Sequence, residues 1–253
     1  MDRVDLNLWW DSRDPAQADD ARRLSRFVSG LPDFDPIYQS WLESPTTKKE
    51  TIPVPLSEAE AKQLLIDNMA RSDFDDRPPT PQFGSQIWGG HAGPAPYDFR
   101  KSSYADTRFY IGSFGQPAGI TANRLLMRLS ALRPATGRPW RASELRPLMK
   151  FARGIWNPAN MCAMFPFHTV HLPSVPNPLQ PAYQRPLKPR IGWITYLPPN
   201  LASRAKYPAD VEVEHLEDGA ALVTLCEELF EKNDVEGLAR LHTLEAALRP
   251  IQS

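Results

Sequence analysis

The chain has 253 residues, of which 42% are hydrophobic, and a formal net charge of −1 at pH 7. A chain of this length buries roughly 70–75% of its unfolded surface, so it needs no disulfide or metal to hold a core. The near-zero charge argues against a global attraction to nucleic acid or membranes, and no segment approaches the ~18 apolar residues of a membrane span.

The first seventy residues predict one strand and two helices. Apolar and polar residues alternate over residues 4–10, which is typical of a half-buried strand. Asp14-Pro15 has the pattern of an N-cap followed by proline, and it begins a helix with an apolar face that ends near Leu31. Ser57 and Glu60 have the spacing of a capping box and begin the second helix.

The middle of the chain predicts strands followed by a helix. The strands are expected at residues 83–90, 107–111 and 123–129. In the last of these, apolar residues alternate with Arg124 and Arg128, so one face is apolar and the other is charged. The third helix begins near Ser143 and stops at Asn157-Pro158, because a proline disfavours the helical conformation of the residue before it.

A Pro-rich segment follows. Nine prolines lie in the 34 residues from Pro166 to Pro199, and most of such a stretch cannot form a central strand or a long helix. We predict an extended arm at about residues 166–189. The exception is a strand at residues 191–197, where apolar and strand-favouring residues are continuous.

The C-terminal part predicts a hairpin and two helices. Strand patterns at residues 211–216 and 220–225 flank Asp218-Gly219, which is a strong hairpin signal. Thr224 and Glu227 have the spacing to cap a short helix, and Asp234 can cap the last one.

These elements predict an α+β fold. Neighbouring strands without intervening helices indicate an antiparallel or mixed β-sheet with helices packed on it. The sequence shows no internal repeat and no clean linker, so we expect residues 1–253 to form a single domain.

Charge is distributed unevenly along the chain. Residues 100–153 contain eleven Lys or Arg and two acids, whereas residues 210–236 contain ten Asp or Glu and one Lys. Two interpretations stay open: the two segments neutralise each other in the fold, or the acidic segment forms a contact surface for a basic partner.

No group of residues has the pattern of a catalytic site. His168 and His171, even with Cys162, would project to opposite sides of a strand and lack further zinc ligands. Asp210, Glu212 and Glu214 share a strand face and could hold a divalent cation, but the lysine expected beside such a nuclease site is absent. We therefore predict a protein without catalytic residues, metal or cofactor.

Cellular location and alternative functions follow from the same features. Cys162 and Cys226 have apolar neighbours, as free thiols in a reducing compartment do, and the N-terminus lacks the apolar run of a signal peptide. We expect a cytoplasmic protein without membrane contact. The alternatives to a pure binding protein are a nucleic-acid-binding protein that uses residues 100–153 and a metal-dependent hydrolase.

An ordered set of residues along nearly the whole chain resembles the immunity protein 52 family. It comprises Trp10, Arg13, Arg22, Leu24, Asp35-Pro36, Trp41, Gly112, Asn123, Trp156-Asn157-Pro158, Gly192 to Leu197, Gly219, Thr224 and Phe230. We interpret Trp10, Arg13, Trp41, Gly192 and Trp193 as structural members of this set.

The resemblance implies an immunity protein of a bacterial polymorphic-toxin system. Its partner would be a toxin encoded by the neighbouring gene, a nuclease of restriction-endonuclease fold that a type VI secretion apparatus injects. Since such a nuclease needs a basic cleft, we expect acidic side chains to bind it. The candidates are Glu212, Glu214, Glu227, Glu228 and Glu231, then Asp73, Asp75 and Asp76, with the Pro-rich arm as a third surface. The oligomeric state and the mode of inhibition stay open.

Overall fold

One antiparallel sheet runs through the molecule. The computed structural model describes residues 3–10, 19–39, 41–43, 51–69, 84–91, 105–112, 123–130, 132–133, 135–164, 191–230 and 234–251. In this part of the chain the strands form a ten-stranded sheet in the order β3-β2-β4-β5-β6-β1-β7-β8-β10-β9. The predicted α+β class with an antiparallel sheet is therefore confirmed.

The elements follow one another along the chain as β1 (Arg3–Trp10), α1 (Asp20–Gly30), β2 (Trp41–Glu43), β3 (Thr51–Ile52), α2 (Glu58–Asp67), β4 (Ser85–His91), β5 (Ala105–Ile111), β6 (Asn123–Ser130), α3 (Ala142–Trp156), β7 (Asn160–Met164), β8 (Ile194–Leu197), α5 (Pro199–Ala202), β9 (Glu212–His215), β10 (Ala221–Thr224) and α6 (Val235–Leu248). Short 3-10 helices lie at Leu31–Asp33, Pro36–Gln39 and Arg249–Ile251. Among the described residues, no helix is both long and apolar enough to cross a membrane.

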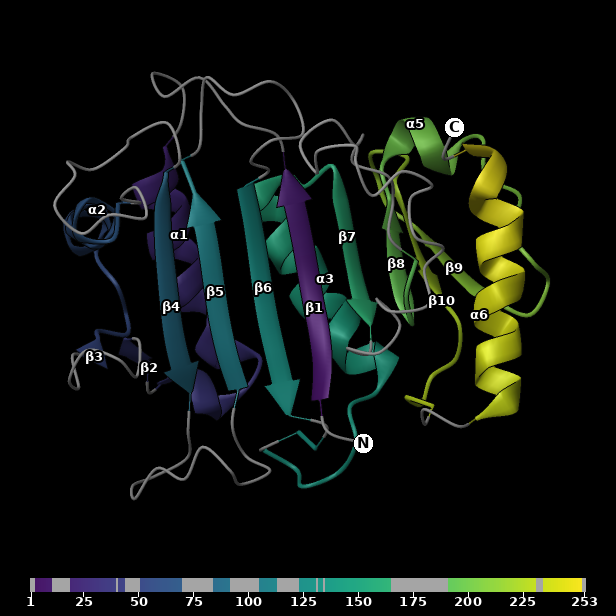
Figure 1. The fold of residues 1–253 in the computed structure, drawn as a ribbon, viewed down its shortest axis with the longest axis horizontal. Helices are drawn as coiled ribbons and strands as arrows, with labels where there is room; N and C mark the ends of the chain where they lie inside the picture. The colour runs from purple at the N-terminus through teal and green to yellow at the C-terminus, as the bar shows by residue number, and fades with distance from the viewer. Residues whose placement is uncertain are drawn as a thin grey trace, which may run out of the picture.

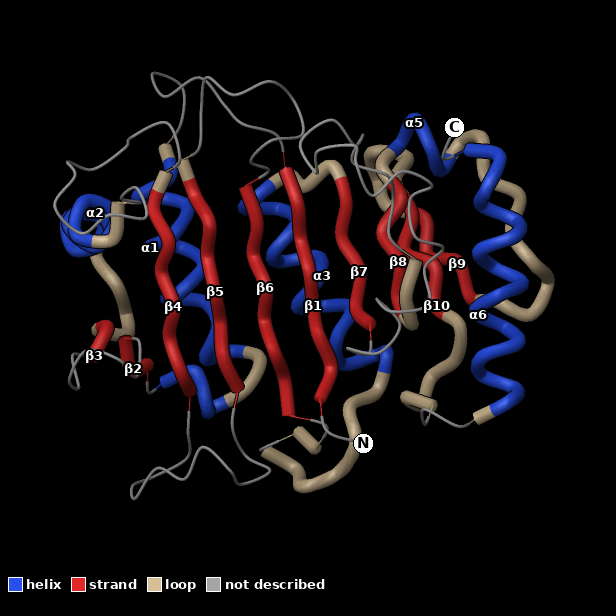
Figure 2. Tube along the Cα trace, viewed as in Figure 1, coloured by secondary structure: helices blue, strands red, loops and turns tan. Residues whose placement is uncertain are grey.

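The helices cover one face of the central strands. In Figure 1, α1 and α3 lie behind β4, β5, β6, β1 and β7, while the other face of these strands is turned to the viewer. α2 lies near the β3–β2 end of the sheet and α6 near the β10–β9 end, as Figure 2 also shows. The sheet therefore has one helix-covered face and one face without a described helix across its centre.

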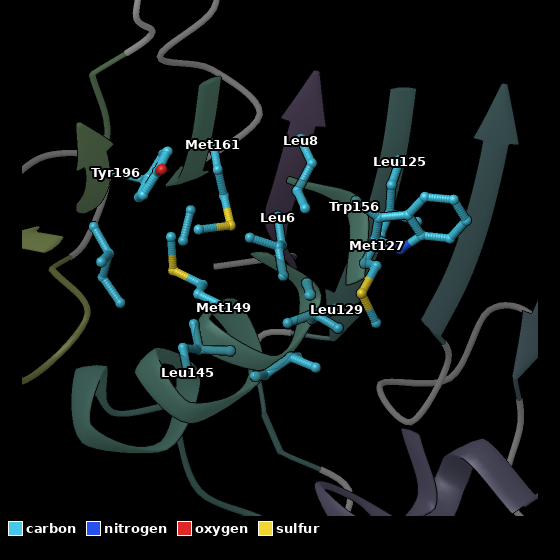
Figure 3. Packing of buried hydrophobic residues seen from close by; sticks show 14 of the residues in the cluster. Leu6, Leu8, Leu125, Met127, Leu129, Leu145, Met149, Trp156, Met161 and Tyr196 are labelled. Carbon is cyan, nitrogen blue, oxygen red and sulfur yellow. The ribbon is translucent and has the colours of Figure 1, made fainter. Parts of the chain in front are cut away.

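The alternation of residue types in β1 decides which face it buries. Leu6 pairs with Met127 of β6, and Leu8 pairs with Leu125 of β6 and Met161 of β7. All five side chains are fully buried and belong to the main core, which Figure 3 shows against α3. Because strand side chains alternate between faces, the intervening residues of β1 project to the face opposite α3.

Aromatic side chains fill the space between the sheet and its helices. The Trp10 ring stacks on Trp156 of α3 with centroids 4.9 Å apart. Phe27 of α1 meets Phe109 of β5 edge to face at 5.7 Å. Such pairs add about 0.5–1.5 kcal/mol to the free energy of apolar burial, so these aromatic contacts help to fix α1 and α3 on the sheet.

Two predicted helix starts are confirmed by their hydrogen bonds. The Ser57 and Glu60 capping box is formed, with Glu60 N donating to Ser57 Oγ at 3.2 Å. The Asp234 carboxylate accepts hydrogen bonds from the backbone N–H groups of Glu236 and Gly237, both at 3.0 Å. Each cap satisfies N–H groups that have no partner within the helix.

Other predictions of local structure were wrong. No helix begins at Thr224 and Glu227: Thr224 ends β10, and Glu227 lies in an irregular segment whose contacts with α3 replace helical hydrogen bonds. The strand predicted at residues 191–197 begins three residues later, because the Gly192 N–H donates to Thr195 Oγ1 at 3.0 Å instead of joining the sheet. β2, β3 and β7 were not predicted from the sequence. The Asp14-Pro15 helix start and the arm at residues 166–189 lie outside the described residues.

Candidate functional site

The acidic C-terminal segment lies against the basic face of α3. Lys150 Nζ is 2.6 Å from Glu214 Oε1, and two further ion pairs join Arg146 to Glu212 and Arg153 to Asp218. The three cations follow one another at i, i+4 and i+7, which places them on one side of a helix. Glu212 and Glu214 are two residues apart on β9, so their side chains share a face. We call these three pairs the ion-pair ladder.

The contact continues to the start of α3. Glu227 accepts hydrogen bonds from the Ser143 hydroxyl and backbone N–H, and the Ala142 N–H donates to the Glu227 carbonyl oxygen at 2.8 Å. Next to it, Arg141 Nη2 lies 3.5 Å from Glu228 Oε1. The anionic Glu227 side chain is stabilised at the positive end of the helix dipole.

The first of the two charge interpretations is therefore what the structure shows: acids of residues 210–236 neutralise cations of residues 100–153 within the fold. Arg146, Lys150 and Arg153, which face the sheet, are not available as a free cationic surface. The i, i+4, i+7 spacing of these residues was the sequence signal for the ladder, but it identifies no partner strand by itself.

The carboxylates are the outer members of most of these pairs. The Glu212 side chain is 56% exposed, whereas its partner Arg146 is 16% exposed. The same order holds for Asp218 over Arg153 and for Glu228 over Arg141, while Lys150 and Glu214 are similarly exposed. Solvent therefore meets the carboxylates of Glu212, Asp218 and Glu228 more than the cations paired with them.

Tyr196 supports the ladder from the sheet. Arg153 Nε donates to the Tyr196 hydroxyl at 3.3 Å, and the guanidinium lies 5.5 Å from the centre of the Tyr196 ring. Burial alone lowers the pKa of Arg153, but the contacts with Tyr196 and Asp218 outweigh burial and raise this pKa above its usual value. The guanidinium stays charged.

Four of the five residues interpreted as structural, Trp10, Trp41, Gly192 and Trp193, occupy buried positions. Trp10, Trp41 and Trp193 are all nearly inaccessible to solvent, and Trp193 Nε1 donates to the Cys226 carbonyl oxygen at 2.8 Å. A Cβ atom at Gly192 would lie 2.4 Å from the Ala163 carbonyl oxygen. A side chain at this position would therefore collide with the backbone of β7.

Several predicted site residues lie outside the described part of the chain. They are Arg13, Asp73, Asp75, Asp76, His168, His171 and Glu231. Cys162 is described and is buried in β7. Within the described ranges, no group of three or more His, Cys, Asp or Glu side chains could hold a metal ion.

Fold and site together define an α+β protein in which acids of the C-terminal segment pair with cations of α3 and are the more exposed members of most pairs. The family model described as Immunity protein 52 matches residues 6–249. The chain therefore belongs to the immunity protein 52 family, whose members are described as immunity proteins and whose role implies binding of a cognate bacterial toxin. No curated protein matches the chain.

Proposed function

We propose that this protein binds and neutralises a nuclease toxin of restriction-endonuclease fold, which a type VI secretion system delivers and the neighbouring gene encodes. The observation that carries the proposal is the family match over residues 6–249. The protein would act in the cytoplasm, where an injected nuclease meets DNA, and it would act by occupying the toxin and not by chemistry of its own.

The outward carboxylates of the ladder and of the neighbouring Glu228 supply the electrostatics. A nuclease that binds DNA presents a basic cleft, and complementary charge accelerates the encounter and suppresses wrong partners. Glu212 and Glu228 are more than half exposed, so they can approach a cationic partner without first being uncovered.

Pairing with α3 also prepares these side chains for binding. A flexible carboxylate loses about 0.5–1.5 kcal/mol of rotamer freedom when a partner fixes it. The ion pairs with Arg146 and Arg141 already restrict Glu212 and Glu228, so less of this cost remains. We propose that Glu214 and Glu227 contribute to the same surface, together with Glu231 and with Asp73, Asp75 and Asp76.

The test uses a charge reversal with a matched control. Glu228→Lys reverses an exposed acid whose arginine partner lies 3.5 Å away. Glu58→Lys on α2 reverses another exposed acid, 3.4 Å from Arg22 and near the other end of the sheet. Affinity for a catalytically inactivated form of the neighbouring toxin is measured by calorimetry in low and high salt.

We expect Glu228→Lys to weaken binding about tenfold or more in low salt and less in high salt, because the effect is electrostatic. Glu58→Lys should bind as the unmodified protein does. Equal affinity of all three proteins in both salts would contradict the acidic surface. Failure of the unmodified protein to inhibit plasmid cleavage by the active toxin would contradict the proposed function itself.

A further inference from the structure

The face of the sheet that points away from α3 carries arginine and tryptophan side chains. Trp88 of β4 pairs in register with Arg108 of β5. Arg124 of β6 lies between Tyr110 of β5 and Trp9 of β1. Because strand side chains alternate between faces, these residues project to the side opposite the buried Leu8 and Leu125. Figure 1 turns this face of the sheet to the viewer. Together with Arg128 and Asp106 we call them the arginine–tryptophan face.

Two cations of this face lie over aromatic rings. The Arg108 guanidinium carbon is 4.0 Å from the centre of the Trp88 ring, and that of Arg124 is 5.5 Å from the Trp9 ring. Arg124 Nη2 also donates to Asn7 Oδ1 at 2.8 Å. Guanidinium groups held in this way are pre-oriented.

The acids of this face lie beneath the cations. Asp106 is only 5% exposed, and its Oδ2 is shared by Arg108 at 3.3 Å and Arg128 at 3.4 Å. Asp5 is similarly buried and pairs with Arg3 at 3.2 Å. In the ladder the carboxylates are the outer members of most pairs, whereas on this face the arginines are. A partner therefore meets positive charge here.

Several polar atoms of this face have no hydrogen-bond partner. Among the described residues, Trp88 Nε1, Arg108 Nε, Arg128 Nε and Asp106 Oδ1 are buried and unpaired. Buried polar groups without partners cost about 1–3 kcal/mol each, and folded proteins rarely leave several of them together. Because these four atoms are themselves inaccessible to solvent, a partner reaches this face through the parts of Arg108, Arg128, Trp88 and Tyr110 that stay partly exposed.

We propose that the arginine–tryptophan face is a second docking surface for the toxin and that it binds a segment of the toxin in which acidic side chains accompany apolar ones. This inference rests on the proposed function, since it names a further contact with the same partner. Carboxylates of the toxin accept hydrogen bonds from Arg108 and Arg128, and its apolar side chains cover Trp88 and Tyr110.

The composition favours a protein over a nucleic acid as the occupant. Tryptophan, tyrosine and arginine are the residues in which binding energy at protein interfaces concentrates. Nucleic-acid binding depends on several freely accessible cations that contact successive phosphates. Arg108 and Arg128 instead share the single carboxylate of Asp106, which partly neutralises them.

The test places a charge at the edge of this face without disturbing its buried pairs. Gln86 of β4 is exposed and pairs in register with Tyr110. Gln86→Glu adds a negative charge there, and Gln86→Lys is the matched control with a positive charge. Binding to the inactivated toxin is measured for both variants, and hydroxyl-radical footprinting follows oxidation of Trp88 and Tyr110 with and without the toxin.

We expect Gln86→Glu to weaken binding about tenfold in low salt and Gln86→Lys to leave it unchanged or tighten it. Trp88 and Tyr110 should be protected from oxidation in the complex. If the toxin binds and is inhibited while both residues stay reactive and both variants bind equally, this inference is overturned and the proposed function stands. If the unmodified protein does not bind the toxin, both fall.

Discussion

The ion-pair ladder makes a stability prediction that is independent of any partner. We consider a double-mutant cycle in which Glu212→Gln and Arg146→Met are made separately and together. Glutamine keeps the size of the side chain without its charge, and methionine keeps most of the apolar stem that lies on the sheet. The cycle therefore isolates the charge interaction between α3 and β9.

The expected size follows from burial. Exposed ion pairs contribute about 0.2–1 kcal/mol, and the low exposure of Arg146, 16%, places this pair at the upper end of that range. We expect a coupling free energy of about 1 kcal/mol in low salt. For a protein of this size, a loss of 1 kcal/mol lowers Tm by about 2–4 °C.

Urea unfolding gives the free energies, and thermal unfolding checks them. The matched control is the pair of Arg240 and Glu236 on α6, 2.5 Å apart and more exposed, for which we expect only about 0.3–0.5 kcal/mol. In 1 M salt both couplings should shrink, because the screening length falls to about 3 Å. A coupling for Arg146 and Glu212 no larger than that of the control pair would refute the reasoning.

Three further predictions concern single positions. Burial and then the neighbouring Asp19 raise the pKa of Asp20 from 3.8 to about 6, so its contribution to stability is lost as pH rises from about 4 to about 6. The full pKa shift corresponds to at most about 3 kcal/mol of stability, and partial exposure of the side chain reduces this to about 1–2 kcal/mol. Asp20→Asn should therefore match the unmodified protein at pH 4 and be more stable by about 1–2 kcal/mol at pH 7.5; equal stability at both pH values would contradict this. Gly192→Ala should cost about 1–3 kcal/mol through overpacking, whereas Gly154→Ala, with open space around the new Cβ, should be neutral or stabilising; equal urea midpoints would contradict the steric argument. Asp234→Ala should cost about 1 kcal/mol through loss of the helix cap, and an unchanged midpoint would show that this cap contributes nothing.

Much of the fold could be predicted because burial imposes simple periodicity. Alternation in residues 4–10 and 123–129 identified β1 and β6 and their buried faces. Spacing of side chains at Ser57 and Asp234 identified helix starts, because the capping hydrogen bonds form within three residues. These signals are local, so a single sequence contains them.

The missed elements depend on distant contacts. β7 has five buried residues between Asn157-Pro158 and the Pro-rich arm, and it forms a strand because β1 and β8 pair with it on both sides. β2 and β3 are too short to show a period. The short helix predicted at Thr224 failed because Glu227 accepts hydrogen bonds from the start of α3, which lies about eighty residues earlier in the chain.

The candidate site was predicted only in part, because it also depends on contacts between residues that are distant in the sequence. Charge counts revealed that residues 100–153 and 210–236 are complementary, but only the sheet order brings β9 beside α3. Of the arginine–tryptophan face, the sequence predicted only the charged side of β6 with Arg124 and Arg128. Its stacking of Arg108 on Trp88 and its unpaired buried atoms arise from the register of β4 with β5, which no local pattern encodes.

Protection of living cells tests the central claim most directly. The toxin encoded by the neighbouring gene is expressed in a bacterial host, alone and together with this protein, and survival and chromosomal DNA integrity are followed. We predict that the toxin alone degrades DNA and kills, that co-expression restores growth, and that the two proteins are recovered as one complex. Undiminished killing in cells that contain the folded protein would contradict the account.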